Sequence, residues 1–162
     1  MKINKPNAAR LLDRAEIAYE LIPYQVDENN LAADHVAQSL GEDINTVFKT
    51  LVLHGEKTGY FVCVIPGNRE VDLKKAARVA GAKKADLIPM KDLLPLTGYI
   101  RGGCSPIGMK KTFPTFIDSR AESHEFIFIS AGQRGLQLKL NPRELSDFIG
   151  GIFADITTEN TI

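Results

Sequence analysis

The stretch VFKTLVLHGEKTGYFVCVIP, residues 47–66, constrains the fold more than any other part of the chain. It holds two runs rich in β-branched and aromatic residues. A segment from Gly55 to Gly59 with a glycine at each end separates them. Two β-prone runs joined by a glycine-containing turn are typical of a β-hairpin. The sequence therefore predicts a hairpin and, with it, a fold built on a β-sheet.

Further strands and helices follow from local patterns. Three short runs, TFPTFID, EFIFIS and LQLKL, are typical of strands, and IFADI is a candidate for another. A strand is also expected just before Tyr24. Apolar spacing and capping residues predict helices over 8–15, from 31 or 32 to 40, over 73–80 and over 142–149. Because strands and helices do not alternate strictly, we expect an α+β fold, a curled, barrel-like mixed sheet flanked by helices.

The chain length and composition fit one domain spanning residues 1–162. With 162 residues, of which 44% are hydrophobic, the chain can bury one core. No apolar run reaches the ~20 residues needed to cross a bilayer, and the first ten residues lack the features of a secretory signal. We expect a cytoplasmic protein without membrane contact. Cys63 and Cys104 have no second Cys or His at metal-ligand spacing, so we expect no metal site.

The net charge of zero conceals an uneven distribution. Between Arg69 and Lys111 lie ten basic and four acidic residues, a local charge of +6. An acidic stretch runs from Asp27 to Asp43. The basic segment is either a solvated face or a phosphate-binding surface suited to a short piece of nucleic acid.

Lys49 is unusual because it lies inside the apolar run of the first hairpin strand. It is either a solvent-facing lysine on an edge strand or a cation held at a cleft, placed to meet a phosphate or a carbonyl oxygen that gains charge.

The loop YIRGGCSPIGMKK, residues 99–111, is the second candidate site. Gly102 and Gly103 allow a ligand to approach the backbone closely, and Pro106 stiffens the loop. Such a loop can present backbone N–H groups to an anion, or it can be a structural turn. Cys104 lacks a neighbouring histidine to stabilise its thiolate, so we do not expect it to be a nucleophile. His35, His54 and His124 form no visible catalytic arrangement with it.

Together these segments resemble a known family. VFKTLV with its lysine, the GxxxP element of Gly102 and Pro106, the following KK-TFPTFID, and ISAGQRGLQLKL are similar to the YbaK/EbsC aminoacyl-tRNA deacylases. The resemblance implies the fold shared with the editing domain of bacterial prolyl-tRNA synthetases. It also implies hydrolysis of cysteine wrongly attached to the tRNA for proline, without a cofactor. The acceptor end of the tRNA is then the partner, and prolyl-tRNA synthetase is a possible second one.

The resemblance also assigns site residues. It places the essential lysine at Lys49 and substrate-binding positions in the hairpin strand, after the first strand, in the glycine loop and in the Ser-Ala-Gly element. These substrate-binding positions are Tyr24, Thr50, Gly102, Gly103, Pro106, Ser130 and Gly132; Asp118 and Arg134 are placed less securely. Leu31 or Ala32 stands where some relatives carry a large apolar pocket residue.

The family mechanism uses the thiol of the substrate, which attacks its own ester carbonyl and leaves as a thiolactone. Two alternatives stay open. The protein could remove another small amino acid such as alanine, which would need a water molecule as nucleophile. It could also be a non-catalytic regulatory binding module of the same fold.

Overall fold

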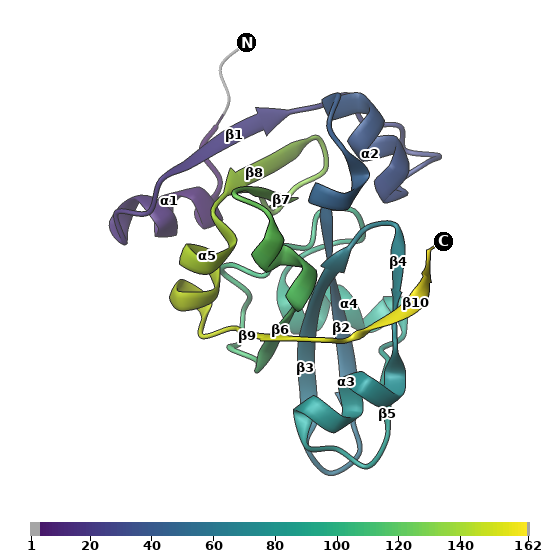
Figure 1. The fold of residues 1–162 in the computed structure, drawn as a ribbon. Coiled ribbons are helices and arrows are strands. Elements are labelled where there is room, and N and C mark those ends of the chain that lie inside the picture. Colours follow the sequence, from purple (N-terminus) through teal and green to yellow (C-terminus); the bar gives the residue numbers. More distant parts are fainter. Residues whose placement is uncertain (1–3, 162) are drawn as a thin grey trace.

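The computed structural model describes residues 4–161 and has helices on both sides of sheets (Figure 1). The helices are α1 (Asn7–Arg14), α2 (Ala33–Leu40), α3 (Leu73–Ala80), α4 (Leu93–Thr97) and α5 (Pro142–Ile149). Three short 3-10 helices accompany them, at Ile44–Thr46, Met90–Asp92 and Ser119–Ser123. The α+β class predicted from the sequence is confirmed.

Side-chain caps explain where two of the helices begin. The Asp72 carboxylate accepts hydrogen bonds from the N–H groups of Lys74 and Lys75 at the start of α3. The Asn141 side chain accepts from two N–H groups in the first turn of α5. Each cap satisfies donors that have no partner within the helix. Both helices end at glycines, Gly81 and Gly150, in the left-handed conformation that favours this residue.

The predicted hairpin is confirmed and forms the centre of a five-stranded sheet. β2 (Phe48–Gly55) and β3 (Gly59–Pro66) pair antiparallel over their full length. β5 (Ala85–Leu87) extends the sheet beside β2, and β6 (Thr115–Asp118) and β9 (Ile152–Ala154) extend it beside β3. Because β3–β6 and β6–β9 are parallel pairs, the sheet is mixed, as expected.

Both faces of the hairpin are covered by apolar side chains. Val62 and Val64 of β3 belong to a core shared with α1 and α5, whereas Phe61 and Ile65 belong to a second core beneath α3. Successive side chains of a strand point to opposite faces, so one apolar run serves both cores. Cys63 is fully buried in the second core, as expected for a packed residue.

A second, three-stranded sheet has the order β1 (Tyr19–Pro23), β8 (Leu136–Leu140), β7 (Ile127–Ser130). An isolated bridge between Val47 and Phe128 connects it to the central sheet. The barrel-like closure predicted from the sequence is wrong. The edge strands β5 and β9 are only three residues long and lie at opposite ends of the central sheet, and the remaining strands pair separately.

The C-terminal segment forms a third pairing, between β10 (Thr157–Thr161) and β4 (Arg69–Val71). The sequence patterns did not predict these two strands, β5 or α4. Over residues 4–161, no helix is long and apolar enough to span a membrane.

Candidate active site

A cavity of about 790 Å³ lies between the start of β2, the segment before α2, the loop 101–104 and the ends of β7 and β8. Its volume falls in the range usual for small-molecule sites. Five residues expected in the site line it: Tyr24, Lys49, Thr50, Gly102 and Ser130. Leu31 and Ala32, expected near the pocket, line it as well. Segments far apart in the sequence therefore build one site.

Lys49 is half-buried in the wall of this cavity. Its Nζ donates a hydrogen bond to the Gly67 carbonyl at 3.3 Å, just past the end of β3. Burial lowers the pKa of Lys49 from its usual 10.5, and the nearby Glu70 carboxylate partly opposes this shift. A cation on a strand in a partly desolvated wall interacts strongly with charge that develops on a bound carbonyl oxygen. β2 is an inner strand of the sheet, but β5 pairs with it only over Leu53–Gly55, so Lys49 lies on a part of β2 that is paired with β3 alone.

The two loop glycines have different roles. Gly102 is exposed, lines the cavity and has φ +83°, a conformation that favours glycine. Gly103 is buried, and a Cβ there would lie 3.0 Å from the Cα of Gln133. Gly103 therefore permits close backbone packing, and Gly102 contacts the cavity.

Arg134 connects this loop to the acidic segment before α2. Its Nε donates to the Arg101 carbonyl at 2.9 Å, and its guanidinium forms an ion pair with Glu28. Arg134 does not line the cavity, so its contacts assign it to positioning the loop.

Gly132 and Pro106 do not line this cavity. The Gly132 N–H donates to Ser130 Oγ at 3.1 Å, and a Cβ at Gly132, where φ is +109°, would approach the Tyr99 ring to 3.0 Å. Pro106 is buried beside a smaller cavity of about 220 Å³. The Tyr99 hydroxyl donates to the Ile107 carbonyl at 2.6 Å and fixes the loop between them. Neither Gly132, Pro106 nor Gly103 lines the larger cavity.

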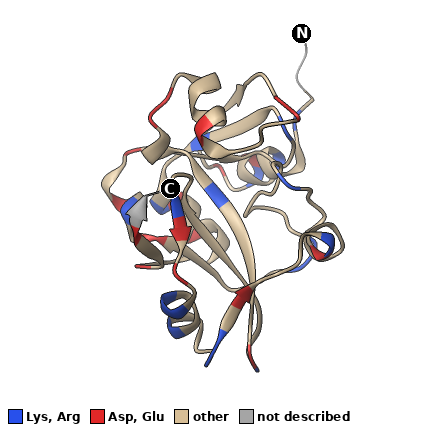
Figure 2. Cartoon of the chain, turned by 90° about the vertical axis from the view of Figure 1, so that its right-hand side faces the viewer, with Lys and Arg blue, Asp and Glu red and all other residues tan. Residues whose placement is uncertain are grey.

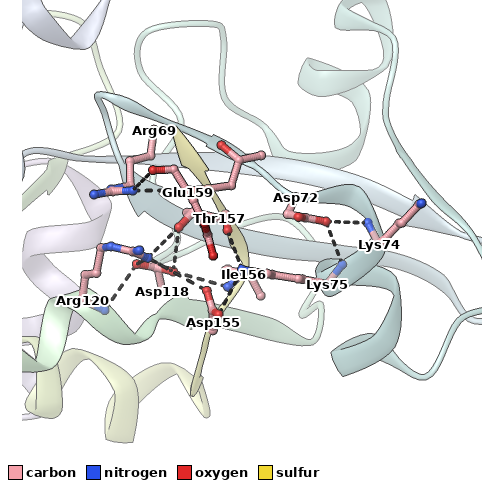
Figure 3. A network of polar contacts seen from close by, with 11 residues as sticks. Arg69, Asp72, Lys74, Lys75, Asp118, Arg120, Asp155, Ile156, Thr157 and Glu159 are labelled. Carbon is pink, nitrogen blue, oxygen red and sulfur yellow. Dashed lines mark hydrogen bonds and ion pairs between the residues drawn. The ribbon is translucent and has the colours of Figure 1, made fainter. Parts of the chain in front are cut away.

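Asp118 is not among the cavity-lining residues; it lies in a buried polar network at the end of β6 (Figure 3). Its carboxylate accepts hydrogen bonds from Arg120, the Ile156 N–H and the Thr157 hydroxyl and is fully buried. Arg120 also donates to Thr157 Oγ1 at 2.7 Å. The geometry assigns Asp118 to anchoring the C-terminal strand rather than to binding substrate.

Four polar cavity residues were not among the predicted site residues: Asp34, Asn68, Arg101 and Gln137. Gln137 lies opposite Ser130 in the β7–β8 ladder and is only 5% exposed. Its Oε1 and the Oγ1 of Thr50 are buried without a hydrogen-bond partner in the described structure. Asn68, in the turn after β3, also lines the cavity and leaves its Oδ1 unpartnered. Buried acceptors without partners are costly, so these atoms are ready to accept hydrogen bonds from a ligand.

The Cys104 thiol lines the cavity but is poorly suited to attack. Burial raises its pKa to about 12, although a hydrogen bond with Thr97 partly opposes the shift. Thiolate, not thiol, is the nucleophile, so the thiol is inert near neutral pH. His35, His54 and His124 do not line the cavity. Within residues 4–161, no cluster of three His, Cys, Asp or Glu side chains could hold a metal ion.

The fold and this cavity belong to a known class of domain. A family model described as "Aminoacyl-tRNA editing domain" matches residues 27–148, most of the chain and every cavity-lining segment from Leu31 to Gln137. The chain belongs to this family, which confirms the resemblance seen in the sequence. The enzyme class that the resemblance implied, an aminoacyl-tRNA deacylase, agrees with this membership.

Similar proteins narrow the assignment further. The chain is 48% identical over 155 residues to the Enterococcus faecalis protein named "Putative Cys-tRNA(Pro)/Cys-tRNA(Cys) deacylase EbsC", covering 96% of this chain and 94% of that one. It is 27% identical over 118 residues to the proline–tRNA ligase of Shouchella clausii, covering 73% of this chain but only 20% of the ligase. A crystal structure described as "a putative trans-editing enzyme for prolyl tRNA synthetase" superposes with a TM-score of 0.79 at 23% identity, covering 97% of this chain and 99% of that one. The last of these likenesses shows the fold alone.

Proposed function

We propose that this protein hydrolyses Cys-tRNA(Pro) in trans, releasing the tRNA for correct charging. The observation that carries the proposal is the half-buried Lys49 cation in the wall of a largely apolar cavity beside Gly102 and Ser130. Family membership and the similarity to the Enterococcus protein support the substrate class. The protein then acts in the cytoplasm, where charged tRNA is made and used.

The cavity offers the groups that an aminoacyl ester requires. The α-ammonium group of the substrate can donate to the unpartnered Gln137 Oε1 and Thr50 Oγ1. The short side chain of cysteine fits the apolar part of the cavity, whose lining includes Leu31 and Val47. Lys49 then faces the ester, where its positive charge stabilises the carbonyl oxygen as negative charge develops.

The nucleophile is supplied by the substrate. The cysteinyl sulfur bonds to its own carbonyl carbon, the ester bond to the ribose breaks, and the thiol proton passes to the departing ribose oxygen. The products are free tRNA and a cysteine thiolactone, which water opens to cysteine. The protein contributes orientation and electrostatic stabilisation, and the inert Cys104 thiol is consistent with this division of roles.

Two other functions are alternatives to hydrolysis of Cys-tRNA(Pro), and the deacylation experiment below distinguishes them. Removal of alanine would need a positioned water molecule, for which the acceptors of Gln137, Thr50 and Asn68 are candidate partners. A non-catalytic binding module would bind charged tRNA without hydrolysing it. The weak similarity to proline–tRNA ligases makes a complex with that enzyme a further proposal.

Deacylation of tRNA(Pro) charged with cysteine, alanine, serine or proline separates these functions. We expect the purified protein to cleave Cys-tRNA(Pro) fastest and Ser-tRNA(Pro) far more slowly, since a hydroxyl is a poorer nucleophile at neutral pH. Cys104→Ala should retain this activity, and a thiolactone should be trapped. Preference for alanine, or loss of activity in a folded Cys104→Ala variant, would refute the mechanism.

A further inference from the structure

A second, smaller cavity of about 220 Å³ lies between α1, α5 and the loop from Pro106 to Phe113 (Figure 1). It is separate from the cavity that holds Lys49, since the two share no lining residue. Its volume is below the ~300–1,000 Å³ of sites for drug-sized ligands, so it suits a molecule with a single ring or a short chain. The proposed hydrolysis leaves this cavity without a role.

Much of the wall of the smaller cavity is apolar. Five partly buried side chains that pack against the main core line it: Leu11, Met109, Phe113, Phe148 and Ile149. Two of them are phenylalanines, and aromatic rings contribute a large apolar area to a contact. The wall therefore favours a ligand with an apolar body over a fully polar one.

Several hydrogen-bond donors without partners border the same cavity. The backbone N–H groups of four lining residues, Gly108, Met109, Lys111 and Thr112, have no hydrogen-bond acceptor within residues 4–161. Lys111 is the one charged side chain among the lining residues, and its ammonium group has no ion-pair partner in the same part of the chain. Free N–H groups close together in a loop, beside a cation, are typical of an anion-binding site. The donors and the apolar wall together suit a small carboxylic acid.

One loop borders both cavities. Gly102 and Cys104 line the larger cavity, whereas Pro106 and Ile107 line the smaller one. The Tyr99 hydroxyl donates to the Ile107 carbonyl at 2.6 Å and so connects the start of the loop to the part that faces the smaller cavity. A ligand in the smaller cavity therefore restrains a segment that also forms the wall of the larger one.

We propose that the smaller cavity is an effector site for a small monocarboxylic acid with an apolar body. The carboxylate accepts hydrogen bonds from the free N–H groups of the loop and pairs with Lys111. The apolar body packs against Phe113 and Phe148. Binding at this site restrains the loop and, through it, the wall of the larger cavity. The site is independent of which charged tRNA, if any, the larger cavity hydrolyses.

Titration of wild-type protein with phenylacetate, phenylacetamide and acetate, followed by NMR, tests this site. Phenylacetate should bind about three- to tenfold more tightly than the uncharged phenylacetamide, because hydrogen bonds to a charged group are stronger. Acetate lacks the ring and should bind at least about tenfold more weakly than phenylacetate, since the ring buries apolar area. Equal affinity for phenylacetate and either of the other two compounds would refute the site.

Lysine variants identify the cation. Lys111→Gln should weaken phenylacetate binding about two- to fivefold, the range for one exposed ion pair, and leave phenylacetamide binding unchanged. Lys110→Gln, at the neighbouring exposed lysine that does not line the cavity, is the matched control and should bind as wild type. Lys49→Met should also bind phenylacetate as wild type does. If Lys49→Met removes binding and Lys111→Gln does not, the carboxylate occupies the larger cavity and the inference is wrong.

Hydrogen exchange measures the effect of the ligand on the loop. The Gly103 N–H donates to the Ile100 carbonyl at 2.9 Å, in the part of the loop beside the larger cavity. Saturating phenylacetate should slow exchange at this amide. The control is the Glu56 amide in the hairpin turn, which donates to the Lys84 carbonyl and should exchange at an unchanged rate. Unchanged exchange at Gly103 would refute the effector role. Neither measurement uses charged tRNA, so failure of this site and failure of the proposed hydrolysis are distinguishable.

Discussion

Lys49 is expected to lower the stability of the fold and to support its activity. A half-buried lysine loses hydration, and burial lowers its pKa for that reason. The Lys49 ammonium group donates one hydrogen bond to the Gly67 carbonyl, which replaces part of the lost hydration. A residue that serves a ligand in this way is expected to reduce stability while it supports activity.

Replacing Lys49 with methionine should therefore separate activity from stability. We expect Lys49→Met to lower the deacylation rate by about 10²–10³-fold, the range for loss of one group that stabilises an oxyanion. Its melting temperature should equal or exceed that of wild type, because methionine fills the space without a buried charge. Lys84→Met, at an exposed position outside the cavity, should change neither quantity. Near wild-type turnover in Lys49→Met would show that the cation is not part of the chemistry.

The same lysine predicts how stability depends on pH. Its folded pKa lies below the usual 10.5, so the folded protein binds fewer protons here than the unfolded chain between the two values. The stability of wild type relative to Lys49→Met should then rise as pH increases toward 10.5. Urea unfolding of both proteins across this alkaline range measures the difference. A difference that stays constant or falls with rising pH would contradict the burial of the charge.

At the scale of elements, the C-terminal segment ties the central sheet to the turn that supports Lys49. β10 pairs with β4, and β4 begins two residues after Gly67. Asp118 at the end of β6 anchors the start of this segment through the Ile156 N–H and the Thr157 hydroxyl (Figure 3). Lys75 on α3 reaches it too, donating to Asp155 and to the Thr157 carbonyl at 3.0 Å each. These contacts hold β10 beside β4, the strand that follows the Gly67 turn, although Asp118 itself does not line the cavity.

Asp118→Ala should destabilise the fold rather than block substrate binding. Removing the acid takes the acceptor away from the buried Ile156 N–H and from the buried Thr157 hydroxyl, and a buried donor left unsatisfied costs about 1–3 kcal/mol. Hydrogen exchange at the Ile156 amide should be faster in Asp118→Ala than in wild type. The KM for Cys-tRNA(Pro), measured on the folded fraction of the variant, should stay near the wild-type value. An increased KM at unchanged stability would instead return Asp118 to the binding site.

At the scale of the whole molecule, some of the basic residues between Arg69 and Lys111 are paired within the fold and others lie on α3, outside the cavity lining. Lys74 and Arg78 lie on α3, at the lower end of Figure 2, and neither lines the cavity. Lys75 is paired with Asp155, and Arg69 donates to the backbone of β10. Part of the positive charge of this segment, which the sequence left as either a solvated face or a phosphate-binding surface, is therefore used inside the fold.

Binding of charged tRNA should accordingly show only modest salt sensitivity. If contacts are confined to Arg101 and a few neighbouring cations, affinity should fall far less than the ~10³–10⁵-fold that six to ten phosphate contacts lose between about 50 and 200 mM salt. Filter binding of Cys-tRNA(Pro) to the slowly reacting Lys49→Met protein, measured before the substrate is hydrolysed, gives the slope. Lys83→Gln together with Lys84→Gln should leave it unchanged; a steep slope flattened by this pair would place the acceptor stem on the basic segment.

Local patterns in the sequence determined the hairpin, the capped ends of α3 and α5, the lysine within a strand and the glycine loop, because each depends on residues a few positions apart. Other features required the tertiary structure. In LQLKL, alternation alone suggests that Gln137 faces solvent, yet packing around β7 and β8 buries it in the cavity wall. Asp118, which the family resemblance placed at the substrate site, does not line the cavity and accepts a hydrogen bond from Thr157, 39 positions away. The pairing of β4 with β10 and the separation of the sheets likewise depend on long-range packing. Short β-prone segments can pair in several registers, and only their packing against the rest of the fold selects one of them.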